Sequence, residues 1–172
     1  PANGICTVAG DQLHFYYSAF SGASPHFGSH KYSGGAVGVA TLRRDGFAAM
    51  VTENGSGTLL TEKLTYAGNH FFVNADCSQG ELWAELLDAE GHLLPGYTRA
   101  ECCTLRGKDS TRWELHWNAK GEQTPWPQVM RVRFGLQNAK LYAFWITDSA
   151  EGKSHGYLAA GSPEANARGK DE

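Results

Sequence analysis

A tryptophan flanked by two glutamates is the group of residues in this sequence best suited to bind a ligand. Segment 81–87 (ELWAELL) alternates apolar and other side chains as a β-strand does, so Trp83, Glu81 and Glu85 share the more polar face. Burying the indole there would bring two carboxylates into the interior, which is costly. A sugar offers an apolar C–H face for stacking and hydroxyls for hydrogen bonds. We therefore expect these three residues to bind a saccharide; the alternative is that Trp83 covers a neighbouring strand or a partner domain.

Two further indoles could serve the same purpose. Trp113 begins the predicted strand 112–117 beside Arg112; this pair would contact sugar, or alternatively Trp113 would join the core. Trp126 lies between two prolines in a loop, where it would be either an anchor for the loop or a rigid exposed platform. Trp117 and Trp145 lie on apolar strand faces and are predicted to be core residues.

The sequence carries no self-sufficient catalytic constellation. It lacks the G-x-S-x-G elbow, the P-loop and the H-E-x-x-H pattern. Glu81 and Glu85 lie about 13 Å apart along a strand that rises roughly 3.3 Å per residue, whereas glycoside hydrolysis needs carboxylates about 5 to 9.5 Å apart. The least favoured alternative is a small hydrolase or metal-dependent oxidase that uses His26, His30 and an acid. We expect no enzyme activity and assign no catalytic residue.

The cysteines do not predict a metal site. Cys6, Cys77, Cys102 and Cys103 lack the paired spacing of zinc ligands. If 101–106 is a strand, Cys103 points inward with Leu105 as a small core residue; a vicinal disulfide is less favoured, and a Cys6–Cys77 disulfide stays open. Polar loops of a β-sandwich can hold a structural calcium ion, but no Asp-rich run marks such a site. We therefore predict no cofactor and leave structural calcium open.

Charge and hydropathy exclude two classes of partner. The chain has 172 residues, with 15 Lys and Arg against 18 Asp and Glu, which gives a net charge of −3. The longest basic run is Arg43-Arg44, so the phosphate neutralisation that a nucleic-acid partner requires is not expected. No apolar run approaches about 18 residues, so we expect no membrane partner.

Short strands separated by turns must position the candidate residues. The chain contains 21 glycines and only 19% charged residues, a composition typical of strands and turns rather than of helix bundles. We predict an all-β fold, an antiparallel β-sandwich of the jelly-roll or concanavalin-like kind, with no substantial helix. The expected organisation is an N-terminal strand and loop at 1–35, the sandwich at 36–148 and a flexible C-terminal tail at 149–172. Strand-like segments recur at 13–20, 36–42, 47–51, 58–64, 70–75, 82–87, 102–105, 112–117, 129–136 and 141–147.

Several segments together resemble one protein family. They are 10–18 (GDQLHFYYS), 37–47 (VGVATLRRDGF), 57–61 (GTLLT), 72–76 (FVNAD), 80–82 (GEL), 109–112 (DSTR) and 141–145 (LYAFW). They resemble the C-terminal portion of large secreted bacterial proteins related to the invertase- and levanase-like glycoside hydrolases. In that family a five-bladed β-propeller carries the catalytic carboxylates, and a β-sandwich follows it.

The resemblance implies a location and a partner for this chain. It implies that strand 13–20 belongs to the last propeller blade, that 1–35 packs on the sandwich, and that the catalytic carboxylates lie in a linked glycoside hydrolase domain. It also implies a secreted or extracytoplasmic protein. The sequence departs from the family pattern at Trp83 and Trp113, where polar or aliphatic residues are more common, and at Cys103. Two additional indoles fit a gained sugar site.

These observations predict a non-catalytic carbohydrate-binding accessory module that recognises a polysaccharide or oligosaccharide by aromatic stacking and polar rim contacts. The alternative is a structural β-sandwich that supports the catalytic propeller and has no ligand of its own. That alternative predicts an exposed apolar patch at Trp83 or at strand 13–20 in the isolated chain.

Overall fold

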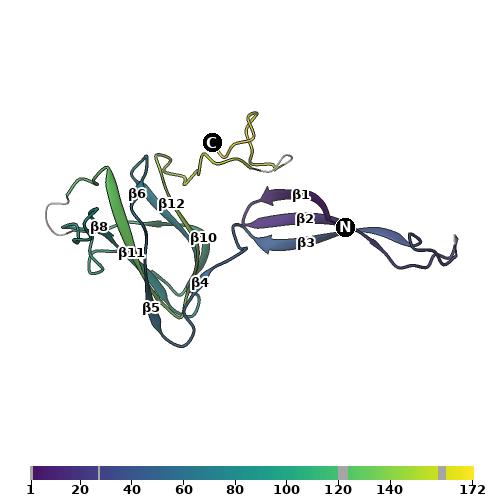
Figure 1. Ribbon diagram of the computed structural model, residues 1–172, viewed down its shortest axis with the longest axis horizontal. Coiled ribbons are helices and arrows are strands. Elements are labelled where there is room, and N and C mark those ends of the chain that lie inside the picture. The colour runs from purple at the N-terminus through teal and green to yellow at the C-terminus, as the bar shows by residue number, and fades with distance from the viewer. Residues whose placement is uncertain (1, 27, 120–123, 159–161) are drawn as a thin grey trace. The chain divides into compact units, whose positions relative to one another are not determined.

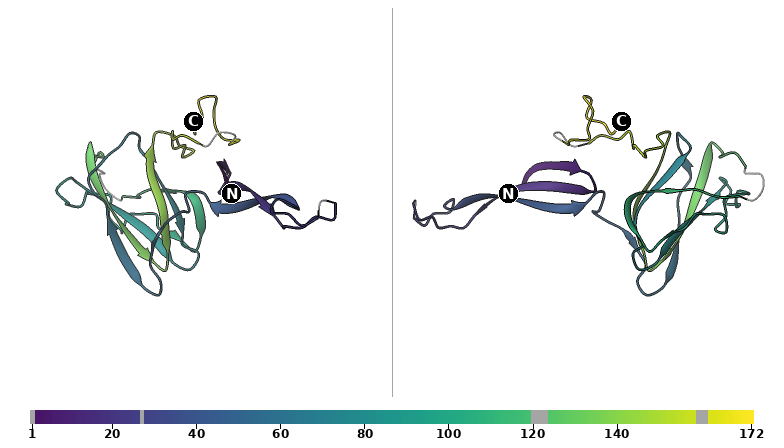
Figure 2. Two further views of the ribbon diagram at one scale, coloured as in Figure 1. Left: turned by 45° about the vertical axis from the view of Figure 1, so that its right-hand side comes forward. Right: turned by 180° about the vertical axis from the view of Figure 1, so that it is seen from behind.

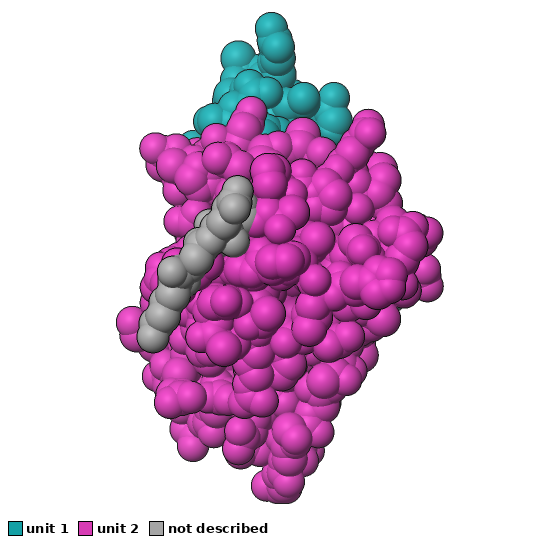
Figure 3. Space-filling model, turned by 90° about the vertical axis from the view of Figure 1, so that its left-hand side faces the viewer, with its two compact units in different colours: residues 1–46, 155–172 teal, residues 47–154 magenta. Residues whose placement is uncertain are grey.

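The structure is a computed structural model that describes residues 2–26, 28–119, 124–158 and 162–172 (Figure 1). Within these residues all regular structure is β-strand, which confirms the predicted all-β class. None of the described residues forms a helix long and apolar enough to cross a membrane. The chain divides into two compact units, which Figure 3 colours separately: unit 1 is 1–46 with 155–172, and unit 2 is 47–154.

Unit 1 is built on a three-stranded antiparallel sheet in the order β1-β2-β3, whose strands lie side by side in the right-hand view of Figure 2. The strands are β1 (Ala2–Ala9), β2 (Gln12–Phe20) and β3 (Gly35–Arg43). A short turn joins β1 to β2, and Gly10 has a φ of 58° there, in a region that glycine adopts without a steric cost. β2 and β3 pair without interruption from Gln12 opposite Arg43 to Phe20 opposite Gly35.

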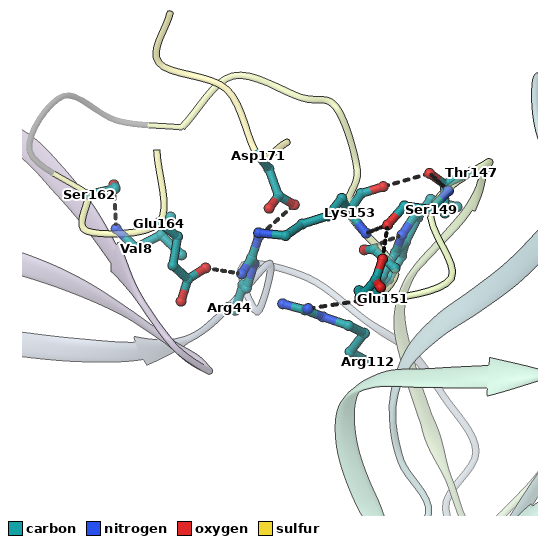
Figure 4. Close-up of polar contacts among 12 residues, drawn as sticks. Val8, Arg44, Arg112, Thr147, Ser149, Glu151, Lys153, Ser162, Glu164 and Asp171 are labelled. Atoms are coloured by element: carbon teal, nitrogen blue, oxygen red, sulfur yellow. Dashed lines mark hydrogen bonds and ion pairs between the residues drawn. The ribbon is translucent and has the colours of Figure 1, made fainter. Parts of the chain in front are cut away.

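The end of the chain completes unit 1. The backbone N–H of Val8 donates to Ser162 Oγ at 2.9 Å, and Arg44 forms ion pairs with Glu164 at 2.8 Å and with the buried Asp171 at 3.3 Å (Figure 4). These contacts place segments from both ends of the sequence in one unit. These units differ from the expected division into 1–35, 36–148 and 149–172. β3 pairs with β2, and Ser162, Glu164 and Asp171 contact Val8 or Arg44.

Unit 2 consists of two antiparallel sheets, as the predicted sandwich requires. One sheet has the order β10-β7-β12-β4, and the other has the order β5-β11-β8-β9, with β6 also paired to β11. The strands are β4 (Met50–Val51), β5 (Ser56–Leu60), β6 (Leu64–Thr65), β7 (His70–Asp76), β8 (Glu81–Leu87), β9 (Leu105–Arg106), β10 (Asp109–Leu115), β11 (Val129–Gln137) and β12 (Lys140–Thr147).

The core of unit 2 lies between these two sheets. The Phe71 ring on β7 lies 6.0 Å from that of Phe134 on β11, so side chains of the two sheets interdigitate. The inward face predicted for 81–87 is confirmed, because the residues at 82, 84 and 86 are each 0% exposed. Trp117 is also in the core, as predicted, and its Nε1 donates to the carbonyl oxygen of Ala84 at 3.0 Å. Other core residues are Val73, Ala75, Cys77, Leu105, Leu115, Met130, Val132, Leu136 and Leu141.

Two core predictions were wrong. Trp145 is half-buried on the outer face of β12, where it stacks on Phe72 and donates from Nε1 to the carbonyl oxygen of Gly152 at 3.1 Å. Cys102, rather than Cys103, joins the core, because regular pairing covers only Leu105–Arg106 and the alternation assumed for 101–106 does not apply. None of the four cysteines forms a disulfide in the described structure.

Candidate functional site

Trp83 lies on the outer face of β8, with Glu81 and Glu85, as its sequence position predicts. Its register partner on β11 is Gly135, and a Cβ atom built there would lie 2.0 Å from two atoms of the indole ring. The ring therefore lies directly on the Gly135 backbone. The guanidinium of Arg99 lies 4.8 Å from the ring centroid. A sugar could stack on Trp83 only after Arg99 had moved away from the ring.

The two glutamates beside Trp83 are engaged by arginines. Glu81 is ion-paired with Arg106 and, at 3.4 Å, with Arg99. Glu85 is ion-paired with Arg133 at 2.9 Å and accepts a hydrogen bond from the backbone N–H of Arg99 at 3.2 Å. Both glutamates are buried, with 9% and 8% exposure. Ion pairs of this kind compensate the cost of burying a carboxylate, and they leave few acceptor positions for a ligand.

Trp113 and Arg112 belong to β10 in the other sheet and do not join the Trp83 face. Trp113 packs against the core, with Lys108 Nζ 4.8 Å from its ring centroid. Its Nε1 is buried and has no hydrogen-bond partner among the described residues. Arg112 is exposed and donates to the carbonyl oxygen of Glu151 at 3.0 Å (Figure 4). The structure therefore separates the two members of this predicted pair.

Trp126 contributes to a pocket of about 460 Å³ that we call the end pocket. Its aromatic lining is formed by Tyr66, Tyr97, Trp117 and Trp126, and its remaining lining by Gly68, Asn69, Glu114, Leu115 and His116. The sequence left two roles open for Trp126, an anchor or a platform. Its ring packs edge-to-face on Tyr66, Tyr97 and Trp117, so the same ring anchors its loop and lines the pocket.

Hydrogen bonds hold the aromatic walls of the end pocket in place. The hydroxyl of Tyr66, the residue after β6, donates to the carbonyl oxygen of Pro127 at 2.5 Å and so links the end of β6 to the loop that carries Trp126. The backbone N–H of Thr124 donates to the carbonyl oxygen of Pro95 at 3.3 Å at the other end of that loop. Burial, together with the neighbouring Tyr97, raises the pKa of Tyr66, so the phenol stays neutral and keeps its hydrogen.

Three of the described lining residues form the polar rim of the end pocket. Asn69 and His116 are exposed, and Glu114 is half-buried at the end of β10. Glu114 Oε1 lies 2.6 Å from His70 Nδ1 on the adjacent strand β7. That contact orients the carboxylate and leaves Oε2 with no hydrogen-bond partner within the described part of the chain.

Sequence reasoning missed Tyr66, Tyr97 and Glu114 as lining residues. Tyr66 and Tyr97 lie in connections between strands, and no local pattern relates them to Trp126. Glu114 gave the only local signal, since strand alternation places it opposite the inward-facing Leu115. For the metal alternative, the described residues contain no group of three or more His, Cys, Asp or Glu side chains that could hold a metal ion, His26 and His30 included.

The end pocket is thus an aromatic recess with hydrogen-bonding groups at its rim, and it is the arrangement in unit 2 best suited to a small polar ligand with an apolar face. Comparisons of the chain with protein-family models, with curated proteins and with solved structures gave no match.

Proposed function

We propose that this chain is a non-catalytic carbohydrate-binding accessory module that holds a sugar residue in the end pocket of unit 2. The observation that carries the proposal is the combination of four aromatic rings with the polar rim of Asn69, Glu114 and His116. Aromatic rings contact the C–H faces of a sugar, and the rim groups supply donors and acceptors for its hydroxyls. A pocket of about 460 Å³ lies within the range of roughly 300–1,000 Å³ usual for small-molecule sites.

The proposed ligand is the one expected from the sequence, but the proposed site is the end pocket rather than the surface around Trp83. Of the residues proposed from the sequence, Trp126 lines the end pocket, whereas Trp83 is covered by Arg99 and its glutamates are ion-paired. The walls of the end pocket are already fixed by hydrogen bonds, so a ligand would not have to order them. Such preorganisation lowers the entropic cost of binding.

The test is a titration of the full chain against a panel of plant, algal and microbial oligosaccharides by isothermal calorimetry. We expect Trp126→Ala and Asn69→Ala to weaken binding, the former by at least about tenfold because it removes an aromatic contact surface. Asn69 is exposed, so its variant tests the rim without disturbing the core. Trp83→Ala is the matched control, an indole deletion outside the pocket. No binding by the wild-type chain, or equal binding by all variants, contradicts the proposal.

A second candidate function, structural support of a larger β-assembly, is favoured by an observation in unit 1. Opposed residues on β2 and β3 leave Tyr16, Val37 and Val39 on one face of the sheet, with 42%, 77% and 50% exposure. Sheets normally bury an apolar face against another layer. In this proposal the face packs against a further β-sheet of a linked domain, such as the propeller implied by the sequence resemblance.

Sedimentation velocity of the isolated chain tests this second candidate. An unsatisfied apolar face predicts concentration-dependent association that Val37→Lys weakens. Val51→Lys, at another exposed valine in unit 2, is the control and is expected to leave association unchanged. A chain that stays monomeric over the whole concentration range contradicts the candidate.

A further inference from the structure

We infer that the end pocket selects a saccharide that carries a positively charged amino group over its neutral and acetylated counterparts. The inference rests on the proposed function and adds the chemical class of the ligand. It is carried by two observations at one place: an aromatic lining, and a carboxylate at the rim with one oxygen available.

The aromatic rings of the end pocket form walls that face different directions. Trp117 and Trp126 lie 6.4 Å apart at 87°, and Tyr97 is inclined to each of them by 69° at 5.6 and 6.2 Å. These rings pack edge to face, and Tyr97 and Trp117 are buried, with 7% and 8% exposure, so the half-buried Tyr66 and Trp126 leave the more accessible aromatic surface. The face of an aromatic ring carries partial negative charge, so an accessible ring face can attract a cation.

Glu114 adds a formal negative charge to the lining. Its Oε1 is held by His70 at 2.6 Å, and its Oε2 has no hydrogen-bond partner among the described residues. Among the described residues the lining contains no Lys or Arg, and His116 is the only other ionisable side chain there apart from the tyrosines. The contact with His70 occupies Oε1, so Oε2 is the oxygen that a ligand can approach.

An amino sugar uses both features together. Its ammonium group can approach Glu114 Oε2 and the ring faces, while its pyranose C–H groups and hydroxyls contact the indole of Trp126 and the rim residue Asn69. An N-acetyl group removes the charge and enlarges the substituent. We expect a preference of about tenfold for the ammonium form, the range that cation–π and rim charge contacts give.

The experiment titrates the full chain with three oligosaccharides of equal length: a glucosamine oligomer, its N-acetylated form and a glucose oligomer. Glu114→Gln removes the charge and is expected to abolish the preference. Glu90→Gln makes the same charge change on an exposed turn of unit 2 and is expected to preserve it. Tetramethylammonium serves as a competitor that carries the cation without the sugar.

The outcomes separate the inference from the proposed function. Preference for the glucosamine oligomer that is lost in Glu114→Gln and partly competed by tetramethylammonium supports the inference. Equal binding of all three oligomers, weakened by Trp126→Ala, overturns the inference and leaves the proposed function standing. If the chain binds none of the three oligosaccharides, whether or not it binds tetramethylammonium, both the inference and the proposed function are overturned. The comparison of the three oligomers with the wild-type chain decides between these outcomes even if Glu114→Gln does not fold.

Discussion

Replacement of Gly135 by alanine should destabilise unit 2 by forcing the Trp83 ring out of position. The new Cβ would lie 2.0 Å from ring atoms Cε2 and Cζ2, whereas carbon atoms in contact lie about 3.5 to 4.0 Å apart. The ring would have to shift by about 1.5 Å or more, and Arg99, 4.8 Å from its centroid, lies over it. Overpacking of this kind costs about 1–3 kcal/mol of the free energy of unfolding.

The sign of this effect is informative because alanine is otherwise the better strand residue. The φ of Gly135 lies outside the left-handed region, so alanine introduces no backbone strain. Replacing a strand glycine would by itself stabilise by about 0.5–1 kcal/mol. A net loss of stability therefore reports the overlap with the ring rather than a loss of backbone freedom.

Urea unfolding of the full chain, followed by far-UV circular dichroism, measures the effect as a shift of the midpoint at unchanged slope. The reasoning requires a double-mutant cycle: in a Trp83→Leu background, Gly135→Ala should cost little or even stabilise. Gly55→Ala is the matched control, since its Cβ would meet only a backbone oxygen at 3.9 Å. An equal loss from Gly135→Ala in both backgrounds would refute the proposed overlap.

Three further perturbations test other contacts. Tyr66→Phe removes the hydrogen bond to Pro127 and should lower the free energy of unfolding by about 0.5–1.5 kcal/mol, measured in urea. In the wild type, burial raises the pKa of Tyr66, so absorbance at 295 nm should show a tyrosine that ionises above the usual pH. Hydrogen bonds from the side chain and backbone of Thr98 lower the pKa of Glu101, so its ionised carboxylate stabilises the fold at neutral pH. Glu101→Gln should therefore lower the free energy of unfolding at neutral pH. This difference from the wild type should disappear as the pH falls through the lowered pKa. Burial raises the pKa of Cys102 to about 11, so a thiol reagent at pH 8 should label it, by peptide mass spectrometry, only after unfolding.

Local alternation predicted most strands of unit 2 and the direction of several side chains, although β6 was not expected as a separate strand and β9 shares only Leu105 with the predicted strand 102–105. The inward face of β8 and the burial of Trp117 follow from patterns within seven residues, and both are confirmed. Alternation failed at Cys103, where the chain is not a regular strand, and at Trp145, where residues 149–154 cover an outer sheet face that the sequence alone left undefined.

The candidate site depended on long-range pairing that one sequence does not reveal. Arg133 reaches Glu85 because β11 pairs with β8 in a particular register, and Arg99 approaches Trp83 from a loop. Tyr66 meets Trp126 although 60 positions separate them in the sequence. Register and loop positions are set by the whole packed unit, so the sequence could suggest that aromatic residues form a site but not which of them meet in space.

The construction of unit 1 from both ends of the chain has a consequence for how the protein forms during synthesis. The bond between Val8 and Ser162 spans 154 positions, and those of Arg44 to Glu164 and Asp171 span 120 and 127. A growing chain can make these contacts only after residues 162–171 have been synthesised, and their loop-closure entropy slows them further. Unit 2 is one continuous segment and can fold first. During synthesis its sandwich can therefore form before β1–β3 make their contacts with residues 162–171. A stop codon just before Ser162 would therefore be expected to harm unit 1 selectively.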